Sequence, residues 1–171
     1  GGRAKPNAAA GPFSTPVMWP FSSRPQSPTA QLAPAAARYA VIDSELTGLD
    51  TRRDAIVSLG GMRIAEGRIV LADRFYEEVQ PTSALTAASI VLHGITPEDV
   101  RGRPGIGAIL EDFSAFCATD ILVGHFIEID LGFLRAAYAK AGLPPIANPA
   151  LDTWPLYDWL SSRTPNDDGP G

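Results

Sequence analysis

The chain has 171 residues, 45% hydrophobic and 19% charged, a composition typical of one globular domain with a sizeable core. Its single cysteine, Cys117, excludes an internal disulfide, and no apolar run suits a transmembrane helix, so a cytoplasmic location without membrane contact is expected. The net charge is −5, but residues 1–38 carry +4, and the −9 on the remainder argues against a broad nonspecific nucleic-acid surface. It does not exclude a nuclease, because bound metal ions supply positive charge where phosphate docks.

Residues 1–38 and 161–171 have the composition of disordered tails. The first segment is rich in Pro, Ala, Gly and Ser and holds seven of the sixteen prolines, so it buries too little apolar surface to offset its ordering entropy. Its opening, Gly-Gly-Arg-Ala-Lys-Pro, also fits a vector-derived remnant. The last eleven residues are rich in Pro, Gly and Asp and show no periodicity. One folded domain is therefore expected over residues 39–160.

Strand-like patterns come first in the folded part. Tyr39–Ile42 is a short apolar run suited to a central strand. Two longer segments, Ala55–Ile64 and Arg68–Val79, are joined by Ala65-Glu66-Gly67, which is a hairpin signal. A fourth, buried strand is predicted at Ile121–Val123.

Helices are predicted from apolar spacing and capping residues at 84–92, 106–117, 126–141 and 151–160. Ser83 is the expected cap of the first helix, and Asp152 or Thr153 of the last. Cys117 lies on the apolar face of the second helix and is expected in the core. The resulting order predicts an α/β fold with a mixed sheet, three antiparallel strands followed by alternating helix and strand, and flanking helices.

The last predicted helix carries three aromatic residues, Trp154, Tyr157 and Trp159. Two interpretations are open for them. They are expected to pack in the core of an amphipathic helix, and the alternative is that they stack on nucleic-acid bases.

Three carboxylates stand where the fold favours apolar residues. Asp43 and Glu45 follow an apolar strand two residues apart, so both side chains project to one side and can reach one ion. Asp130 has large apolar neighbours at three and four residues distance, so it is expected to face the sheet. The alternatives are a turn that begins at Asp43 and a buried ion pair of Asp130 with Arg52 or Arg53.

The segments around these acids resemble the motifs of the DEDD-type 3′–5′ exonucleases. The sequence Ile42-Asp-Ser-Glu-Leu-Thr-Gly-Leu49 resembles the first motif, Asp-x-Glu-Thr-Thr-Gly, with Leu46 as a departure. The sequence Val123-Gly-His-Phe-Ile-Glu-Ile-Asp-Leu-Gly-Phe-Leu134 resembles the second, Val-Gly-His-Asn-x-x-Phe-Asp-x-x-Phe-Leu, with Phe126 and Ile129 as departures.

Two further segments extend the resemblance from about Tyr39 to Leu160. Leu92-His-Gly-Ile-Thr96 is similar to a segment of the epsilon proofreading subunit of bacterial DNA polymerase III and its relatives, which include the RNase T group. Leu151-Asp-Thr153 resembles the end of a later family strand. The motifs occur in the family's order.

The resemblance implies a ribonuclease-H-like fold and a two-metal phosphodiester hydrolase acting on the 3′ end of single-stranded DNA or RNA. Asp43, Glu45 and Asp130 would be the catalytic residues and would hold two Mg²⁺ or Mn²⁺ ions, which stabilise the attacking and leaving oxygens. The terminal nucleotide would contact Thr47, Gly48, Leu49 and His93, although His93 has the alternative role of ending its helix. The family also admits a polymerase or replication complex as a partner, and proofreading as a role.

The family's fourth carboxylate and its general base form a late His-x-x-x-x-Asp, and the sequence has no histidine after residue 125. His125 and Asp130 have this spacing, but the residues around them resemble the second motif instead. One interpretation is that the domain is incomplete at its C-terminal side and that the 171 residues alone cut weakly or not at all. The other is a catalytically inactive exonuclease-like module that binds nucleic acid or a replication partner.

Overall fold

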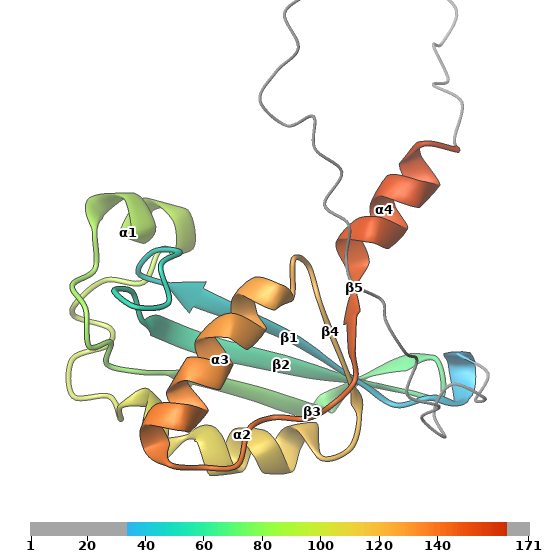
Figure 1. The fold of residues 1–171 in the computed structure, drawn as a ribbon, viewed down its shortest axis with the longest axis horizontal. Helices are drawn as coiled ribbons and strands as arrows, with labels where there is room; N and C mark the ends of the chain where they lie inside the picture. Colours follow the sequence, from blue (N-terminus) through green and yellow to red (C-terminus); the bar gives the residue numbers. More distant parts are fainter. Residues whose placement is uncertain (1–33, 164–171) are drawn as a thin grey trace, which may run out of the picture. The chain divides into compact units, whose positions relative to one another are not determined.

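The computed structural model describes residues 34–163, which fold around a five-stranded sheet in the order β3-β2-β1-β4-β5 (Figure 1). The strands are β1 (Tyr39–Leu46), β2 (Ile56–Ala65), β3 (Arg68–Glu78), β4 (Ile121–Gly124) and β5 (Ala150–Asp152). The α-helices are α1 (Ala87–His93), α2 (Leu110–Cys117), α3 (Glu128–Ala141) and α4 (Thr153–Ser161). Short 3₁₀ turns occur at Pro34–Ala36 and Ile106–Ala108.

Most of the two predicted disordered tails, residues 1–33 and 164–171, lies outside the described residues. The boundaries at 38 and 161 therefore stay predictions. Between residues 34 and 163, no helix combines the length and the apolar character that crossing a membrane requires.

The sheet is mixed, as the sequence predicts. β1 pairs antiparallel with β2, and β2 antiparallel with β3, whereas β4 lies parallel to β1 and β5 parallel to β4. Two registers place the candidate site: Asp43 lies opposite Gly60 of β2, and Val41 lies beside Val123 of β4. The carboxyl ends of β1, β4 and β5 consequently meet at one edge of the sheet.

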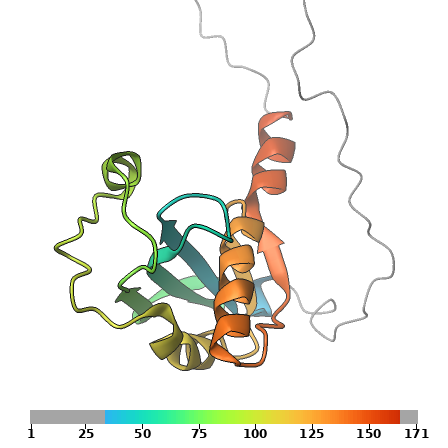
Figure 2. The same ribbon diagram turned by 60° about the vertical axis from the view of Figure 1, so that its left-hand side comes forward.

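The main core lies between the sheet and the pair α2 and α3, which Figures 1 and 2 show on the same side of the sheet. Its buried side chains include Ile42, Leu59, Phe113, Leu122 and Leu134. Burying large apolar side chains of this kind contributes roughly 1.5–3 kcal/mol each relative to exposure.

Cys117 is fully buried, as predicted, and burial raises the pKa of its thiol to about 12. α1 is placed beyond the carboxyl end of β1 (Figure 1), where it borders the candidate site.

The predicted helix over 84–92 begins later, because Thr86 rather than Ser83 caps it. The Thr86 hydroxyl accepts the backbone N–H of Ser89, and the Ser89 hydroxyl accepts the N–H of Thr86, which is a reciprocal capping box. Ser83 instead bonds through its hydroxyl to that of Thr47 at 2.7 Å. The hydroxyl of Ser83 is therefore engaged by a residue that is distant in the sequence, which a local pattern does not reveal.

The end of the described chain differs most from prediction. Residues 150–152 form β5, a strand that sequence periodicity did not indicate, and Asp152 caps α4 by accepting the N–H of Trp154. No residue of α4 is buried, and Trp154, Tyr157 and Trp159 are 41%, 60% and 54% exposed. The prediction that these aromatic side chains lie in the core is therefore wrong for this structure.

Candidate active site at the carboxyl end of β1

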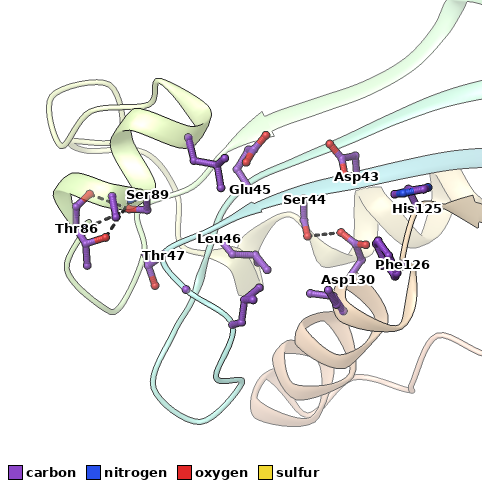
Figure 3. Close-up of a pocket in the computed structure, with 15 residues that line it drawn as sticks. Asp43, Ser44, Glu45, Leu46, Thr47, Thr86, Ser89, His125, Phe126 and Asp130 are labelled. Carbon is purple, nitrogen blue, oxygen red and sulfur yellow. Dashed lines mark hydrogen bonds between the residues drawn. The ribbon is translucent and has the colours of Figure 1, made fainter. Parts of the chain in front are cut away.

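Asp43 and Glu45 project from the same face of β1. Ile42 between Val41 and Asp43 is buried in the core, so alternation along the strand sends Asp43 and Glu45 to the opposite face. Figure 3 shows both carboxylates on one side of β1 and Ser44 on the other. The partner of Asp43 across the ladder is Gly60, which has no side chain to fill the space beside that carboxylate. The structure thus places Asp43 and Glu45 on the same side of β1, as the sequence predicts.

Asp130 approaches the same strand from the first turn of α3. Its side chain is 5% exposed, and its Oδ1 accepts the Ser44 hydroxyl at 2.5 Å (Figure 3). Burial raises the pKa of Asp130, the Ser44 hydrogen bond opposes this, and the negative charge of Asp43 adds to the increase. Asp130 and Asp43 therefore lie near enough to repel each other, with Ser44 between them along the chain.

The ion pair that was the alternative for Asp130 does not form. Arg52 and Arg53 are 93% and 86% exposed along their side chains, and both lie nearest Asp50, at 4.0 and 3.6 Å. Asp130 therefore has a hydroxyl partner and no basic one among residues 34–163. An acid that is buried in this way is the kind of group whose charge a bound cation would compensate.

One pocket of about 500 Å³ brings most of the predicted residues together. Asp43, Glu45 and Asp130 line it, as do the predicted nucleotide-binding residues Thr47, Gly48 and Leu49. His93 does not line this pocket. It lines a neighbouring hollow of about 310 Å³, which it shares with Asp43 and Glu45.

The side chains that line these two spaces have the donor chemistry of a Mg²⁺ or Mn²⁺ site, because carboxylate oxygens are the ligands that such hard cations prefer. In the part of the chain from 34 to 163, however, no three His, Cys, Asp or Glu side chains converge closely enough to hold one ion. Asp43 and Asp130 supply one close pair of acids, and Glu45 shares a wall with them.

The loop after β1 is held by Thr47 and Asp54. The Thr47 hydroxyl accepts the N–H of Ala55 at 3.0 Å, and the Thr47 N–H donates to the Ala55 carbonyl at 3.0 Å. Asp54 accepts the N–H of Asp50 at 2.9 Å, and a Cβ on Gly48 would lie 2.4 Å from its carboxylate oxygen. Gly48 is thus required by close packing, and the backbone at Leu49 stays beside the pocket.

His93 ends α1 and also faces the acids. Its Nδ1 accepts the backbone N–H of Ile95 at 3.0 Å, so the proton of the neutral ring is on Nε2. That Nε2 is buried and has no hydrogen-bond partner within residues 34–163. His93 therefore closes α1, which was one of its two expected roles, and it carries an unpaired ring nitrogen in the wall of a hollow that Asp43 also lines. Its contact with a nucleotide stays a prediction.

A cluster of rings at the mouth of the pocket was not predicted. The Phe126 and Trp154 rings stack with centroids 4.9 Å apart, and His125 meets both edge-on. The Asp152 Oδ1 accepts the N–H groups of both Phe126 and Trp154, at 3.1 and 2.8 Å. Phe126 has a φ of +53°, a left-handed conformation that costs an L-residue roughly 1–2 kcal/mol. This φ also explains why α3 begins at Glu128, two residues later than predicted.

Sequence reasoning missed Ser44, Asp54 and Tyr76 as parts of the site. Ser44 and Asp54 stand inside the first motif and the loop that follows it, but only the folded contacts reveal their partners. Tyr76 lines the hollow with His93, and burial together with Glu78 raises its pKa. Its position two residues from Glu78 on one strand was a usable signal, because both side chains then share a face.

Comparisons with known proteins agree with this arrangement. The RNase T family of exonucleases matches residues 40–166. The polymerase called "DNA polymerase III PolC-type" from Listeria innocua is 38% identical over 124 residues, which are 72% of this chain, and a PolC-type polymerase from Halalkalibacterium halodurans is 35% identical over the same length. The chain spans only 8% of the length of these relatives.

The fold has solved counterparts in exonuclease I of E. coli. The metal-free form of its complex with single-stranded DNA has a TM-score of 0.67, with 15% identity over 76% of this chain and 31% of that one. A zinc-bound form of the same complex has the same TM-score. These likenesses show the ribonuclease-H-like exonuclease fold, and the family match covers most of the sequence. The chain belongs to the RNase T family of exonucleases, within the DEDD-type 3′–5′ exonuclease superfamily.

Proposed function

We propose that this chain is the metal-binding part of a 3′–5′ exonuclease that hydrolyses the last phosphodiester bond of a single-stranded nucleic acid. The observation that carries the proposal is the placement of Asp43, Glu45 and the buried Asp130 around one pocket at the end of β1. Family membership supports the reaction class, and the name of the PolC-type relatives supports association with a DNA polymerase. Proofreading in the cytoplasm is the role that we propose for it.

Asp43, Glu45 and Asp130 would hold two Mg²⁺ or Mn²⁺ ions. When bound, such ions supply positive charge beside the phosphate and make a water molecule a better nucleophile. Asp43 shares a strand face with Glu45 and acts on the charge of Asp130, so of the three acids it is the one we propose would contact both ions. Ser44 fixes the orientation of Asp130 through its hydrogen bond.

The terminal nucleotide would enter between the β1 loop and α1. Thr47, Gly48 and Leu49 form one wall, and the 74% exposed Leu49 offers an apolar surface for a sugar or base. The unpaired Nε2–H of His93 would donate to an oxygen of that nucleotide from the neighbouring hollow. Replacing His93 by Gln is expected to weaken substrate binding more than it lowers the maximal rate.

The test is hydrolysis of a 3′-labelled single-stranded oligonucleotide, with Mn²⁺ and with EDTA. Metal-dependent release of label from the 3′ end, reduced on the order of 100-fold or more in Asp43→Asn, supports the proposal. A matched control is Asp50→Asn, because Asp50 is an exposed acid of the following loop and is not among the residues lining the pocket. Release from a 5′-labelled strand without prior loss of the 3′ end would contradict the stated polarity.

A second candidate is an exonuclease-like module that binds a 3′ end without cutting it. The observation that favours it is that no three-ligand group is found between residues 34 and 163. Binding of the labelled strand by folded protein, with no metal-dependent hydrolysis, would select this candidate. Slow hydrolysis that Asp43→Asn removes would select the enzyme.

A further inference from the structure

The ring cluster beside the carboxylate pocket has a second property, which is its exposure. Phe126, Trp154 and Tyr157 form a continuous row, with centroids 4.9 Å apart for the first pair and 6.0 Å for the second. The two pairs have interplanar angles of 27° and 30°, so each ring lies within about a third of a right angle of parallel to its neighbour. Each ring nevertheless leaves 41% or more of its residue surface open to solvent.

The row is built to hold its orientation. Asp152 bonds to the backbone N–H of both Phe126 and Trp154, which ties the β4–α3 connection to the start of α4. Thr153 adds a second tie, because its hydroxyl donates to the carbonyl of Gly124 at 3.1 Å and contacts Nδ1 of His125 at 3.0 Å. Phe126 keeps a left-handed backbone that is unfavourable for a bulky residue. Strain at an exposed ring beside a pocket indicates a binding role rather than a packing role.

The row begins inside the proposed active site. Phe126 lines the same pocket as Asp43 and Asp130 and is labelled beside Asp130 in Figure 3, and Trp154 and Tyr157 continue from it along α4. None of the described residues that line the pocket is a lysine or arginine. Pairing with phosphate therefore contributes little there, and attraction for a strand must come from bound cations and from the faces of its bases.

We propose that Phe126, Trp154 and Tyr157 form a stacking platform for the unpaired bases of a single strand whose 3′ end lies in the carboxylate pocket. The proposal rests on the proposed function for the location of the 3′ end. Base stacking on exposed aromatic rings tolerates any sequence, because every base has a π-face. The platform recognises the base and not the sugar, so DNA and RNA strands are both ligands.

The experiment measures binding of a fluorescent ten-nucleotide strand to the full chain in EDTA, so that hydrolysis does not interfere. Three strands are compared: oligo-dT, oligo-rU and an abasic strand of the same length. The abasic strand keeps the phosphates and thus accounts for any binding by the basic residues of 1–33. We expect both base-containing strands to bind about tenfold more tightly than the abasic strand.

Single substitutions test which ring residues are responsible for the base-dependent binding. Phe126→Leu and Trp154→Leu keep an apolar side chain but lose the ring, and each is expected to remove most of the difference between base-containing and abasic strands. Tyr157→Leu is the variant least able to disturb folding, since its residue is 60% exposed, and it should weaken base-dependent binding several-fold. The matched control is Trp159→Leu. Trp159 is equally exposed on α4 but lies five residues from Trp154, outside the row, with Arg163 over its ring.

Equal affinity for base-containing and abasic strands, or an equal loss with Trp159→Leu, would overturn the platform. The second result would indicate that α4 is covered by a protein segment or acts as a whole. The binding experiment tests the platform separately from the hydrolysis that tests the proposed function. A platform without an active enzyme gives base-dependent binding and no hydrolysis, and an enzyme without the platform cuts while the leucine variants bind normally.

Discussion

The hydroxyl of Ser44 donates to Oδ1 of Asp130 at 2.5 Å, so the middle residue of Asp43-Ser-Glu45 is fastened to the first turn of α3. One side of β1 thus carries the acids Asp43 and Glu45, and Ser44 on the other side positions a third acid, Asp130. Ser44 is in this sense the residue that connects the two family motifs.

Replacing Asp130 by Asn should stabilise the metal-free protein at neutral pH. Burial raises the folded-state pKa of Asp130 above its usual 3.8, so the folded state holds the proton more tightly than the unfolded state. The stabilisation that comes from this tighter proton binding is fully present below the pKa of Asp130 in the unfolded chain. It is lost as the pH rises through the raised pKa of Asp130 in the folded chain. Asn remains neutral, so the free energy of unfolding in EDTA should fall less between about pH 4 and pH 7 than it does for the wild type.

The control for this variant is Asp112→Asn. Asp112 is an exposed acid in the first turn of α2, as Asp130 is a buried acid in the first turn of α3. Its replacement should cost at most ~0.5 kcal/mol through the helix dipole and give no gain at neutral pH. If the free energies of unfolding of the wild type and Asp130→Asn change with pH in parallel, burial does not destabilise the charged form of Asp130, and the prediction is wrong.

Manganese should raise the thermal stability of the wild-type chain through the same acids. At a free concentration tenfold above the dissociation constant, binding to the folded state adds about 1.4 kcal/mol, which shifts the unfolding temperature by roughly 4 °C. Asp43→Asn should remove most of this shift, because Asp43 lines both cavities and is the acid whose charge acts on Asp130. Asp50→Asn, in an exposed position, should keep it. An undiminished shift in Asp43→Asn would locate the bound metal elsewhere.

Patterns with a period of two or 3.6 residues predicted the elements of this fold that have a buried face. Ile42 alternates with Asp43 and Glu45 because one face of β1 must meet α2 and α3, so the placement of those two acids follows from local sequence. α3 was predicted for the same reason. What failed was β5, whose three residues gain their structure only by pairing with β4.

The aromatic residues of α4 show a different limit. Apolar spacing predicts that a helix has an apolar face, but it does not predict whether another part of the protein packs against that face. In the described structure, α4 has no buried residue. The strain at Phe126 was also invisible in the sequence, although the family motif offered a signal. Asn stands there in the resemblance, and Asn tolerates a positive φ better than Phe does.

Arg63→Leu should be among the most destabilising single substitutions in the domain. Arg63 is 4% exposed and binds Asp120, Asp73 and the carbonyl of Phe116, so the leucine would leave Asp120 buried with Arg38 as its ion-pair partner. Breaking a buried ion pair on one side costs about 3–5 kcal/mol. Urea unfolding measures this, and a loss under about 1 kcal/mol would show that the pair is solvated.

Two further variants separate the charge effect from packing. Arg53→Leu breaks an exposed pair with Asp50 and should cost less than about 1 kcal/mol. The double variant Arg63→Leu with Asp120→Leu removes both charges, so it should recover part of the stability lost in Arg63→Leu. A double variant that is no more stable than Arg63→Leu would point to lost packing against Phe116, whose ring lies 4.5 Å from the Arg63 guanidinium.

Ala118→Gly should stabilise the fold, because Ala118 ends α2 with a φ of +45° and a ψ of −121°. This backbone is unfavourable for any residue with a Cβ, and glycine relieves roughly 1 kcal/mol of strain. The residue is exposed, and its carbonyl can still accept the Asn148 side-chain amide. The midpoint of thermal unfolding should therefore shift upward by about 3 °C. Ala115→Gly, three residues earlier within α2, should shift it downward, because glycine inside a helix costs about 0.5–1 kcal/mol. Shifts of the same sign in both variants would mean that chain flexibility, and not the left-handed backbone at Ala118, controls the effect.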